Sequence, residues 1–459
     1  MNFDPKVEHK ALDCSWKSVW GVTIPLMFSM LSHFLMLLID RSMLAAYSMD
    51  SMNAATMSGN FVCIFVFMFT GITSTAVIFV GRYNGAGYHE KLSAPIWQMI
   101  YMSLLTCVIS IPVAYFSDYI NILPDCYRKE GVEYQKTLMY FSITAPIRSS
   151  LSAFFVGQGK TKVITFVVSV GVILNIALDY VFIFGINGIV PPMGCKGAAI
   201  ATVIAEFIQI IVLAALFFSR KNRRIYKTFE NRQVNVELFL GCIRIGLPIA
   251  LGNVLSMITW NVIQSAVCHV STDMATIYNI GMNVYTFFLF AAEGADKAVA
   301  TICSNMIGRG DLDSVEKIRR IFVSISIFFG AVVAVPLIMY PEWLFRVLSS
   351  FSGNISNLYE DIRQVLPLVA LNVTLETLVY SQWGILTAGG DSKYAVISLQ
   401  ICQWVFVAFP TLLLYQLDAI THVQPIFLLI AISLTTTWLL IYRRYRGMQW
   451  LTDIEKKYS

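Results

Sequence analysis

The sequence predicts an all-α membrane protein whose twelve transmembrane helices form two pseudo-symmetric six-helix lobes. Three observations lead to this fold class: a weakly charged composition, twelve long apolar runs and a repeat between the two halves of the chain. Of the 459 residues, 57% are hydrophobic and 13% are charged, whereas soluble proteins have about 25% charged residues. Together with a mean hydropathy of +0.66, this composition excludes a soluble enzyme, a nucleic-acid binder and a disordered scaffold.

Twelve segments are long and apolar enough to cross a bilayer, which takes about 20 mostly apolar residues. Glycine-rich and proline-rich turns separate several of them, including those at 84–87, 157–159 and 389–391. The predicted spans are 17–44, 52–83, 92–117, 133–156, 161–185, 195–219, 236–269, 274–307, 315–340, 361–387, 392–416 and 422–442.

The basic residues predict how these spans are oriented. With the N-terminus in the cytoplasm, 23 of the 33 Lys and Arg residues fall on the cytoplasmic side and seven on the outer side, as the positive-inside rule requires. Both termini are therefore expected in the cytoplasm, with the chain in a plasma membrane or a bacterial inner membrane. The polar N-terminal segment lacks the apolar core of a cleavable signal peptide.

The second half of the chain repeats the first at a numbering offset of 223. Pro25 then falls on Pro248 and Gly71 on Gly294, and a small change of offset to 231 places Gly159 on Gly390. A parallel repeat of six spans is typical of transporters with a central site between the halves. The expected organisation is an N-terminal segment (1–16), an N-lobe (17–219), a linker (220–234), a C-lobe (235–442) and a C-terminal tail (443–459).

Four polar residues of the first half predict a cation site. Asp40 lies late in the first span, Asn175 and Asp179 share one face of the fifth span, and Thr202 lies in the sixth. Ionisable groups inside a bilayer are functional candidates because burying them costs free energy. Carboxylate, amide and hydroxyl oxygens suit a hard cation such as Na⁺, and two neighbouring buried carboxylates equally favour a proton. No other metal ion and no cofactor is expected.

Each member of this set is also compatible with a structural role. Asp40 precedes Arg41 and could form an interfacial pair with it. Asn175 could join two helices by a hydrogen bond, and Asp179 could lie at the headgroup level beside Tyr180. The repeat places Asp40 opposite an isoleucine, so the predicted cation chemistry belongs to the first half alone.

A second set of polar residues is expected to form either a salt-bridge network or the polar wall of a substrate cavity, with a second protonation site as a further possibility. Within it, Glu293 and Lys297 have the favourable i, i+4 order for an ion pair. The members are Arg148, Glu206, Glu293, Asp296, Lys297 and Glu376.

Other patterns narrow the function. No Walker motif, GxSxG motif or Cys/His cluster is present, so the sequence does not predict an enzyme. Cys126 and Cys195 fall in outer loops, where free thiols are favoured over a disulfide. Pro25 and Pro248 remove backbone hydrogen bonds and are expected to bend their helices.

Several motifs, taken together, are similar to those of the multidrug and toxic-compound extrusion (MATE) family of secondary transporters, over nearly the whole chain. They are IPLMFSMLSHFLMLLID, GRYNGAG, VGQGKTK, LNIALDYVFIFG and MGCKGAAIAT, with the second-half counterparts IGLPIALG, MIGRGD and TAGGDSKYAV. The resemblance implies a V-shaped central cleft and export of amphipathic, often cationic, drugs or metabolites in exchange for Na⁺ or H⁺. It also implies that Asp40, Asn175, Asp179 and Thr202 bind the cation, and that Pro25 bends during coupling.

The chain departs from this family at two places. One sodium-coupled branch has an acidic residue where Ser256 stands, and the Glu293, Asp296 and Lys297 group is not part of the general family pattern. This group suggests a zwitterionic or anionic substrate. The expected partners are a small-molecule substrate and the lipid bilayer, with no nucleic acid, and a monomer as the working unit. The alternative function is a flippase or exporter for a lipid-linked precursor or a specific metabolite.

Overall fold

The computed structural model describes residues 12–119, 123–186, 188–343 and 356–451. Its helices are α1 (Trp16–Tyr47), α2 (Met49–Ser74), α3 (Ala76–Gly85), α4 (Ala94–Tyr115), α5 (Arg128–Tyr140), α6 (Thr144–Gly157), α7 (Thr161–Phe184), α8 (Gly194–Phe217), α9 (Arg220–Tyr226), α10 (Val236–Cys268), α11 (Thr272–Gly308), α12 (Leu312–Met339), α14 (Tyr359–Gly389), α15 (Ser392–Gln403), α16 (Phe409–Gln416) and α17 (Gln424–Arg446).

The predicted all-α fold with twelve membrane helices is confirmed. Ten helices or helix pairs within the described ranges are long and apolar enough to cross a membrane. The predicted spans 274–307 and 133–156 complete the set as α11 and as the pair α5–α6. Neither counts among the ten, because α11 contains several polar residues and α5 and α6 are each short.

Three predicted spans contain an interruption that the apolar pattern does not reveal. The span 52–83 divides into α2 and α3 at Thr75, whose hydroxyl donates to the carbonyl of Ile72 at 2.7 Å. The span 133–156 divides before Pro146, which lies in the first turn of α6. The span 392–416 contains a π-helical turn just before Pro410. Both prolines lack the N–H that would have continued the helix.

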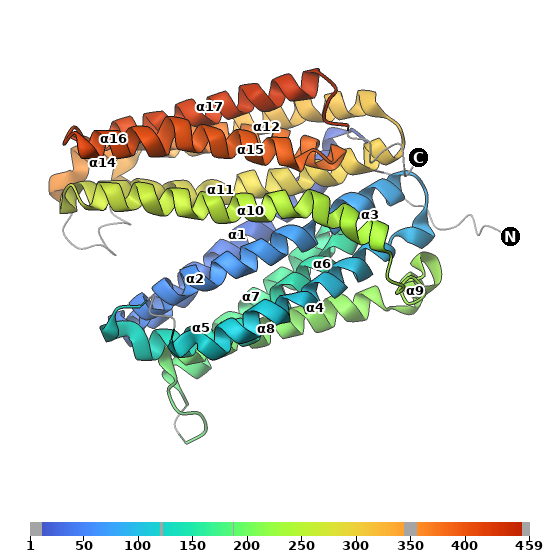
Figure 1. The fold of residues 1–459 in the computed structure, drawn as a ribbon, viewed down its shortest axis with the longest axis horizontal. Coiled ribbons are helices and arrows are strands. Elements are labelled where there is room, and N and C mark those ends of the chain that lie inside the picture. The colour runs from blue at the N-terminus through green and yellow to red at the C-terminus, as the bar shows by residue number, and fades with distance from the viewer. Residues whose placement is uncertain (1–11, 120–122, 187, 344–355, 452–459) are drawn as a thin grey trace.

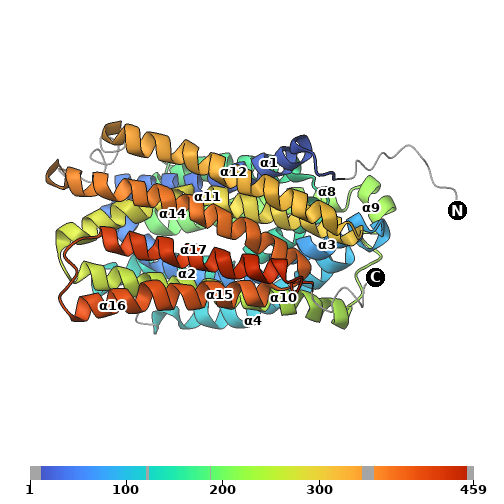
Figure 2. The same cartoon turned by 90° about the horizontal axis from the view of Figure 1, so that it is seen from above.

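The two halves of the chain form two helix layers that converge at one end of the molecule and diverge towards the other (Figure 1). Helices α12, α14, α15 and α17 of the second half lie next to one another along the long axis (Figure 2). Between the layers, α1 packs against α11 and α2 against α10. Helix α1 begins and α17 ends at the convergent end, which we call the terminal end.

The contacts between the layers obey the repeat that the sequence predicts. At the terminal end, a side chain on Gly85 would collide with the backbone of Asn305, and a side chain on Gly308 would collide with the backbone of Arg82. The offset of 223 relates Gly85 to Gly308, and it also relates Arg82 to Asn305. Each contact is therefore the image of the other, and a pseudo-twofold axis passes between α3 and α11.

The same relation holds deeper in the molecule. Gly71 of α2 lies against the backbone of Ala250 in α10, and Gly294 of α11 lies against the backbone of Met27 in α1. Met27 and Ala250 are again equivalent positions at the offset of 223. The two halves thus meet through equivalent surfaces, as a parallel repeat requires.

Hydrogen bonds in both directions join the two halves at the terminal end. The Arg82 guanidinium donates to the carbonyl of Ala388 through Nε at 3.2 Å and Nη2 at 2.6 Å. In the opposite direction, Asn305 Nδ2 donates to the carbonyl of Gly157 at 2.9 Å. Gly157 and Ala388 occupy equivalent positions at the offset of 231. We call these three bonds the terminal-end latch.

The segment 220–234 between the halves lies on the first half. Trp97 Nε1 donates to the carbonyl of Thr228 at 2.7 Å, and Gln98 Nε2 donates to that of Gln233 at 3.0 Å. Lys227 Nζ lies 2.5 Å from Glu90 Oε2, and this hydrogen bond raises the pKa of the Lys227 ammonium group. These contacts fix the basic segment against the start of α4.

Candidate functional site

The carboxyl group of Asp40 is buried in the half of α1 that lies away from the terminal end. Its side chain is 5% exposed, and its Oδ1 has no hydrogen-bond partner. The neighbouring Arg41 turns towards α2, where its Nη1 donates to Thr56 Oγ1 at 2.9 Å. This geometry disfavours the interfacial Asp40–Arg41 pair, because a membrane-surface pair would leave both side chains in water.

Asn175 and Asp179 lie on the buried face of α7, which packs between α1 and α8. They are 1% and 0% exposed, and neither polar atom of either side chain has a hydrogen-bond partner. Tyr180 beside them is exposed instead, so Asp179 does not share its outward position. Burial of this kind is costly unless a ligand or a proton satisfies the group.

The structure brings Asp40, Asn175 and Asp179 together between α1 and α7. Asp40 and Asp179 are both buried, on two helices that pack closely against each other. Thr202 is half-buried on the adjoining helix α8, and its hydroxyl donates to the carbonyl of Ala198 at 3.0 Å. The hydroxyl oxygen retains a lone pair for a further contact. These residues, which we call the carboxylate site, fit a cation or a shared proton by the chemistry of their oxygens.

Glu206 connects helices of the first half. It accepts a hydrogen bond from Thr144 Oγ1 of α6, and its other carboxylate oxygen lies 3.4 Å from Arg148 Nη2. Both side chains are partly exposed, at 25% for Arg148 and 20% for Glu206. One ion pair of the predicted network is thus present, within the first half.

The expected Glu293–Lys297 ion pair is wrong. Among the described residues, no carboxylate lies within 4.0 Å of Lys297 Nζ, which instead lies 3.1 Å from Met30 Sδ of α1. Asp296 lies against Gly384 of α14, within its own half. Sequence spacing permits the pair, but the Lys297 side chain extends from α11 to Met30 of α1.

Glu376 of α14 is buried in the second half and is satisfied by a residue that sequence reasoning missed. Tyr285 Oη of α11 donates to Glu376 Oε2 at 2.8 Å. Tyr285 is 4% exposed, and a tyrosine this deep in a helix usually has a hydrogen-bond partner. The available signal in the sequence was a tyrosine within a predicted membrane span, but nothing in the sequence identifies its hydrogen-bond partner.

Pro25 and Pro248 lie inside α1 and α10, and both helices continue through them. The missing N–H of Pro25 leaves the carbonyl of Gly21 without its helical donor, and Thr161 Oγ1 of α7 donates to this carbonyl at 3.3 Å. Thr165 Oγ1 also donates to the carbonyl of Pro25 at 2.7 Å. The predicted bending of these helices stays a prediction.

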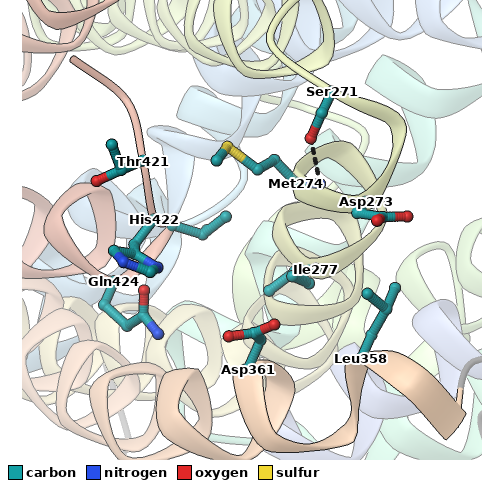
Figure 3. A pocket seen from close by; sticks show the side chains of 10 residues that line it. Ser271, Asp273, Met274, Ile277, Leu358, Asp361, Thr421, His422 and Gln424 are labelled. Carbon is teal, nitrogen blue, oxygen red and sulfur yellow. Dashed lines mark hydrogen bonds between the residues drawn. The ribbon is translucent and has the colours of Figure 1, made fainter.

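A cavity of about 280 Å³ lies at the end of the second half opposite the terminal end (Figure 3). Asp273, Asp361 and His422 of the second half line it, whereas the carboxylate site lies in the first half. Across the described ranges, no group of three or more His, Cys, Asp or Glu side chains is arranged to hold a metal ion. Cys126 and Cys195 are both free thiols.

Comparison with known proteins identifies the family. The profile of the MatE family matches residues 25–181 and 248–412, one segment in each half and most of the chain in total. The chain belongs to the MatE family. Since members of this family move compounds across membranes, this MatE protein is a multi-pass membrane transporter and not an enzyme.

Curated relatives agree with this assignment. A probable multidrug resistance protein NorM of Thermotoga maritima is 25% identical over 353 residues, 76% of this chain and 75% of the relative. Another from Mannheimia succiniciproducens is 24% identical and covers 96% of this chain and 97% of its own. The uncharacterized transporter YisQ of Bacillus subtilis is 21% identical over 95% of both chains.

Solved structures share the fold. A MATE protein in complex with MaL6 superposes with a TM-score of 0.84 at 15% identity, over 99% of this chain and all of the other. The eukaryotic MATE transporter AtDTX14 gives 0.78 at 17%, covering 96% of this chain and 97% of its own. A MOP superfamily transporter from Pyrococcus furiosus gives 0.83 at 15%, over 98% of both chains.

Proposed function

We propose that this MatE protein is a cation-coupled antiporter that exports amphipathic organic compounds, including cationic drugs or metabolites, in exchange for Na⁺ or H⁺. The observation that carries the proposal is the carboxylate site: three buried polar side chains of α1 and α7 whose polar atoms lack hydrogen-bond partners in the protein. The names of the NorM relatives, which are multidrug resistance proteins, support the substrate class.

The carboxylate site performs the coupling. When it is open to the outside, a cation binds between Asp40 and Asp179 and removes their mutual repulsion. Asn175 supplies a neutral oxygen beside them, and Thr202 completes the set from α8. Antiport requires that bound cation and bound substrate each weaken the other's binding, which is a coupling free energy between two sites. Helix α1 packs on both halves and can transmit this coupling.

The basic residues favour a cytoplasmic terminal end, with both chain termini on that side of a cell membrane. The latch closes this end in the present conformation. A single chain contains both halves and the carboxylate site, so a monomer is the proposed working unit. The cation reaches the site from the opposite, outer side.

The test is efflux of a fluorescent organic cation from proteoliposomes under an imposed Na⁺ gradient and, separately, a pH gradient. We expect one gradient to drive transport, and Asp40→Asn to abolish the response. Asp50→Asn is the matched control, because Asp50 is exposed at the start of α2 near the same end. Equal gradient-driven transport by the wild type and Asp40→Asn would refute the proposal.

A further inference from the structure

Lys297 is the starting point, because its charge is directed out of its own half. Its ammonium group lies 3.1 Å from Met30 Sδ on α1 and, in the described part of the chain, has no carboxylate within ion-pair distance. The side chain is partly exposed. A lysine inside a membrane segment without an anionic partner is costly unless water or a ligand reaches it.

The acidic residue next to Lys297 is directed elsewhere. Asp296 lies against Gly384 of α14, and its Oδ1 has no hydrogen-bond partner. Helix α11 therefore presents Asp296 to the second half and Lys297 to α1 at the boundary between the halves.

Arg148 provides a second cation at this boundary. Its contact with Glu206 is a single long one, with Nη2 and Oε1 3.4 Å apart, while Thr144 occupies the other carboxylate oxygen. Arg148 Nε has no hydrogen-bond partner. A guanidinium has five N–H donors, so most of its capacity remains available.

His33 of α1 lies next to the Lys297 contact, because it is exposed one turn from Met30. Asn305 of α11 contacts Gly157 of α6, and Lys297 and Arg148 lie about 12 Å and about 14 Å from this contact along their helices, so they lie at a similar depth. Helices α6, α1 and α11 thus bring three basic side chains from both halves to one place. On α1 this place is seven residues from Asp40, or about 10 Å along the helix.

We infer that His33, Arg148 and Lys297 form a subsite for an anionic group of the transported compound, a carboxylate or a phosphate. The inference rests on the proposed function and deepens it, since the substrate would combine an amphipathic body with a negative group. Planar guanidinium and ammonium donors match both anions by charge-assisted hydrogen bonds. The anion would come from a free zwitterionic compound or from a lipid headgroup.

The test compares two dyes that differ by one methyl ester. Tetramethylrhodamine has a free carboxylate, and its methyl ester lacks that charge. With purified full-length protein in nanodiscs of phosphatidylcholine, we expect Lys297→Gln to weaken binding of the free acid about tenfold, as loss of one charge-assisted hydrogen bond predicts. Affinity for the ester should change less than twofold. Lys221→Gln, at an exposed linker position, is the matched control.

Equal changes for both dyes, no change for either, or no binding of the free acid by the wild type would overturn the subsite. The proposed antiport is tested separately by gradient-driven efflux of the ester, which does not use the carboxylate. Adding phosphatidylglycerol to the nanodiscs distinguishes the two sources. If phosphatidylglycerol competes with the free acid in the wild type but not in Lys297→Gln, the subsite is supported and its anion is a lipid headgroup. If binding of the free acid depends on Lys297 and phosphatidylglycerol does not compete, the subsite is supported and its anion belongs to a free compound.

Discussion

The carboxylate site makes Asp40 and Asp179 two parts of one ligand set, since both are buried where α1 packs on α7 and their buried oxygens lack hydrogen-bond partners. Asp179→Asn should therefore reduce cation-driven transport about tenfold or more, the effect of losing one charged ligand. Adding Asn175→Ala to Asp179→Asn should reduce transport little further, because groups that act as a unit are not additive. Initial efflux rates in proteoliposomes measure this, and multiplying effects would show two independent sites.

Tyr285 and Glu376 form a second buried polar pair, in the other half. Tyr285→Phe leaves Glu376 without its donor and should lower the free energy of unfolding by about 1–3 kcal/mol. Thermal unfolding of the purified protein measures the change, with Tyr340→Phe as the control because Tyr340 is exposed. A Tyr285→Phe, Glu376→Leu variant should recover part of the loss, since the uncompensated carboxyl is gone. No recovery would mean that Glu376 has a further role.

At the scale of helices, α7 supplies a donor for the backbone carbonyl that Pro25 leaves without one in α1. The hydroxyl of Thr161 donates to the carbonyl of Gly21, which an ordinary residue at position 25 would satisfy through its own N–H. Thr161→Val should destabilise the protein by about 1 kcal/mol. The same substitution in a Pro25→Ala background should cost much less, because the backbone N–H of the introduced alanine replaces the lost donor. Thermal unfolding measures both costs. An equal loss of free energy of unfolding in both backgrounds would show that Thr161 does not replace the donor that Pro25 lacks.

The second half has a similar contact, displaced by one residue from the equivalent carbonyl. Ser392 is the equivalent of Thr161 at the offset of 231, and its hydroxyl donates to the carbonyl of Ile245 near Pro248 at 2.6 Å. In both halves, a hydroxyl group at the start of a later helix thus donates a hydrogen bond to a carbonyl of the proline-containing helix. The repeated proline and glycine positions in the sequence were sufficient to predict equivalent helices, but they do not reveal these hydrogen bonds.

At the scale of the whole molecule, the spans and the repeat could be predicted from the sequence because length, hydropathy and repeated glycines determine them. The directions of the side chains could not be predicted from the sequence. Glu293 and Lys297 have ideal spacing, yet Lys297 turns to α1. The breaks at Thr75 and before Pro146 were also hidden, because short interruptions hardly change a long apolar average. The cation residues were predicted individually, and their common burial required the packing of α1 on α7.

The close approach of the halves at the terminal end predicts how that end opens. A side chain on Gly308 would collide with the backbone of Arg82, so Gly308→Ala should shift the protein towards conformations separated at this end. A cysteine placed at Ser304, buried against Gly81 in the same interface, should then react faster with a maleimide. The background has the native cysteines replaced. Gly21→Ala is the control, since that site has open space. Unchanged labelling would show that the interface does not limit opening.

The pseudo-twofold axis also bears on why both halves are joined in one chain. Arg82 and Asn305 occupy equivalent positions on either side of the axis, yet only one of them is charged. Two copies of the first half would place two guanidinium groups across the axis, where like charges repel. Two copies of the second half would place two asparagines there instead and would lack the carboxylate site. The residues at this contact therefore make each half specific for the other.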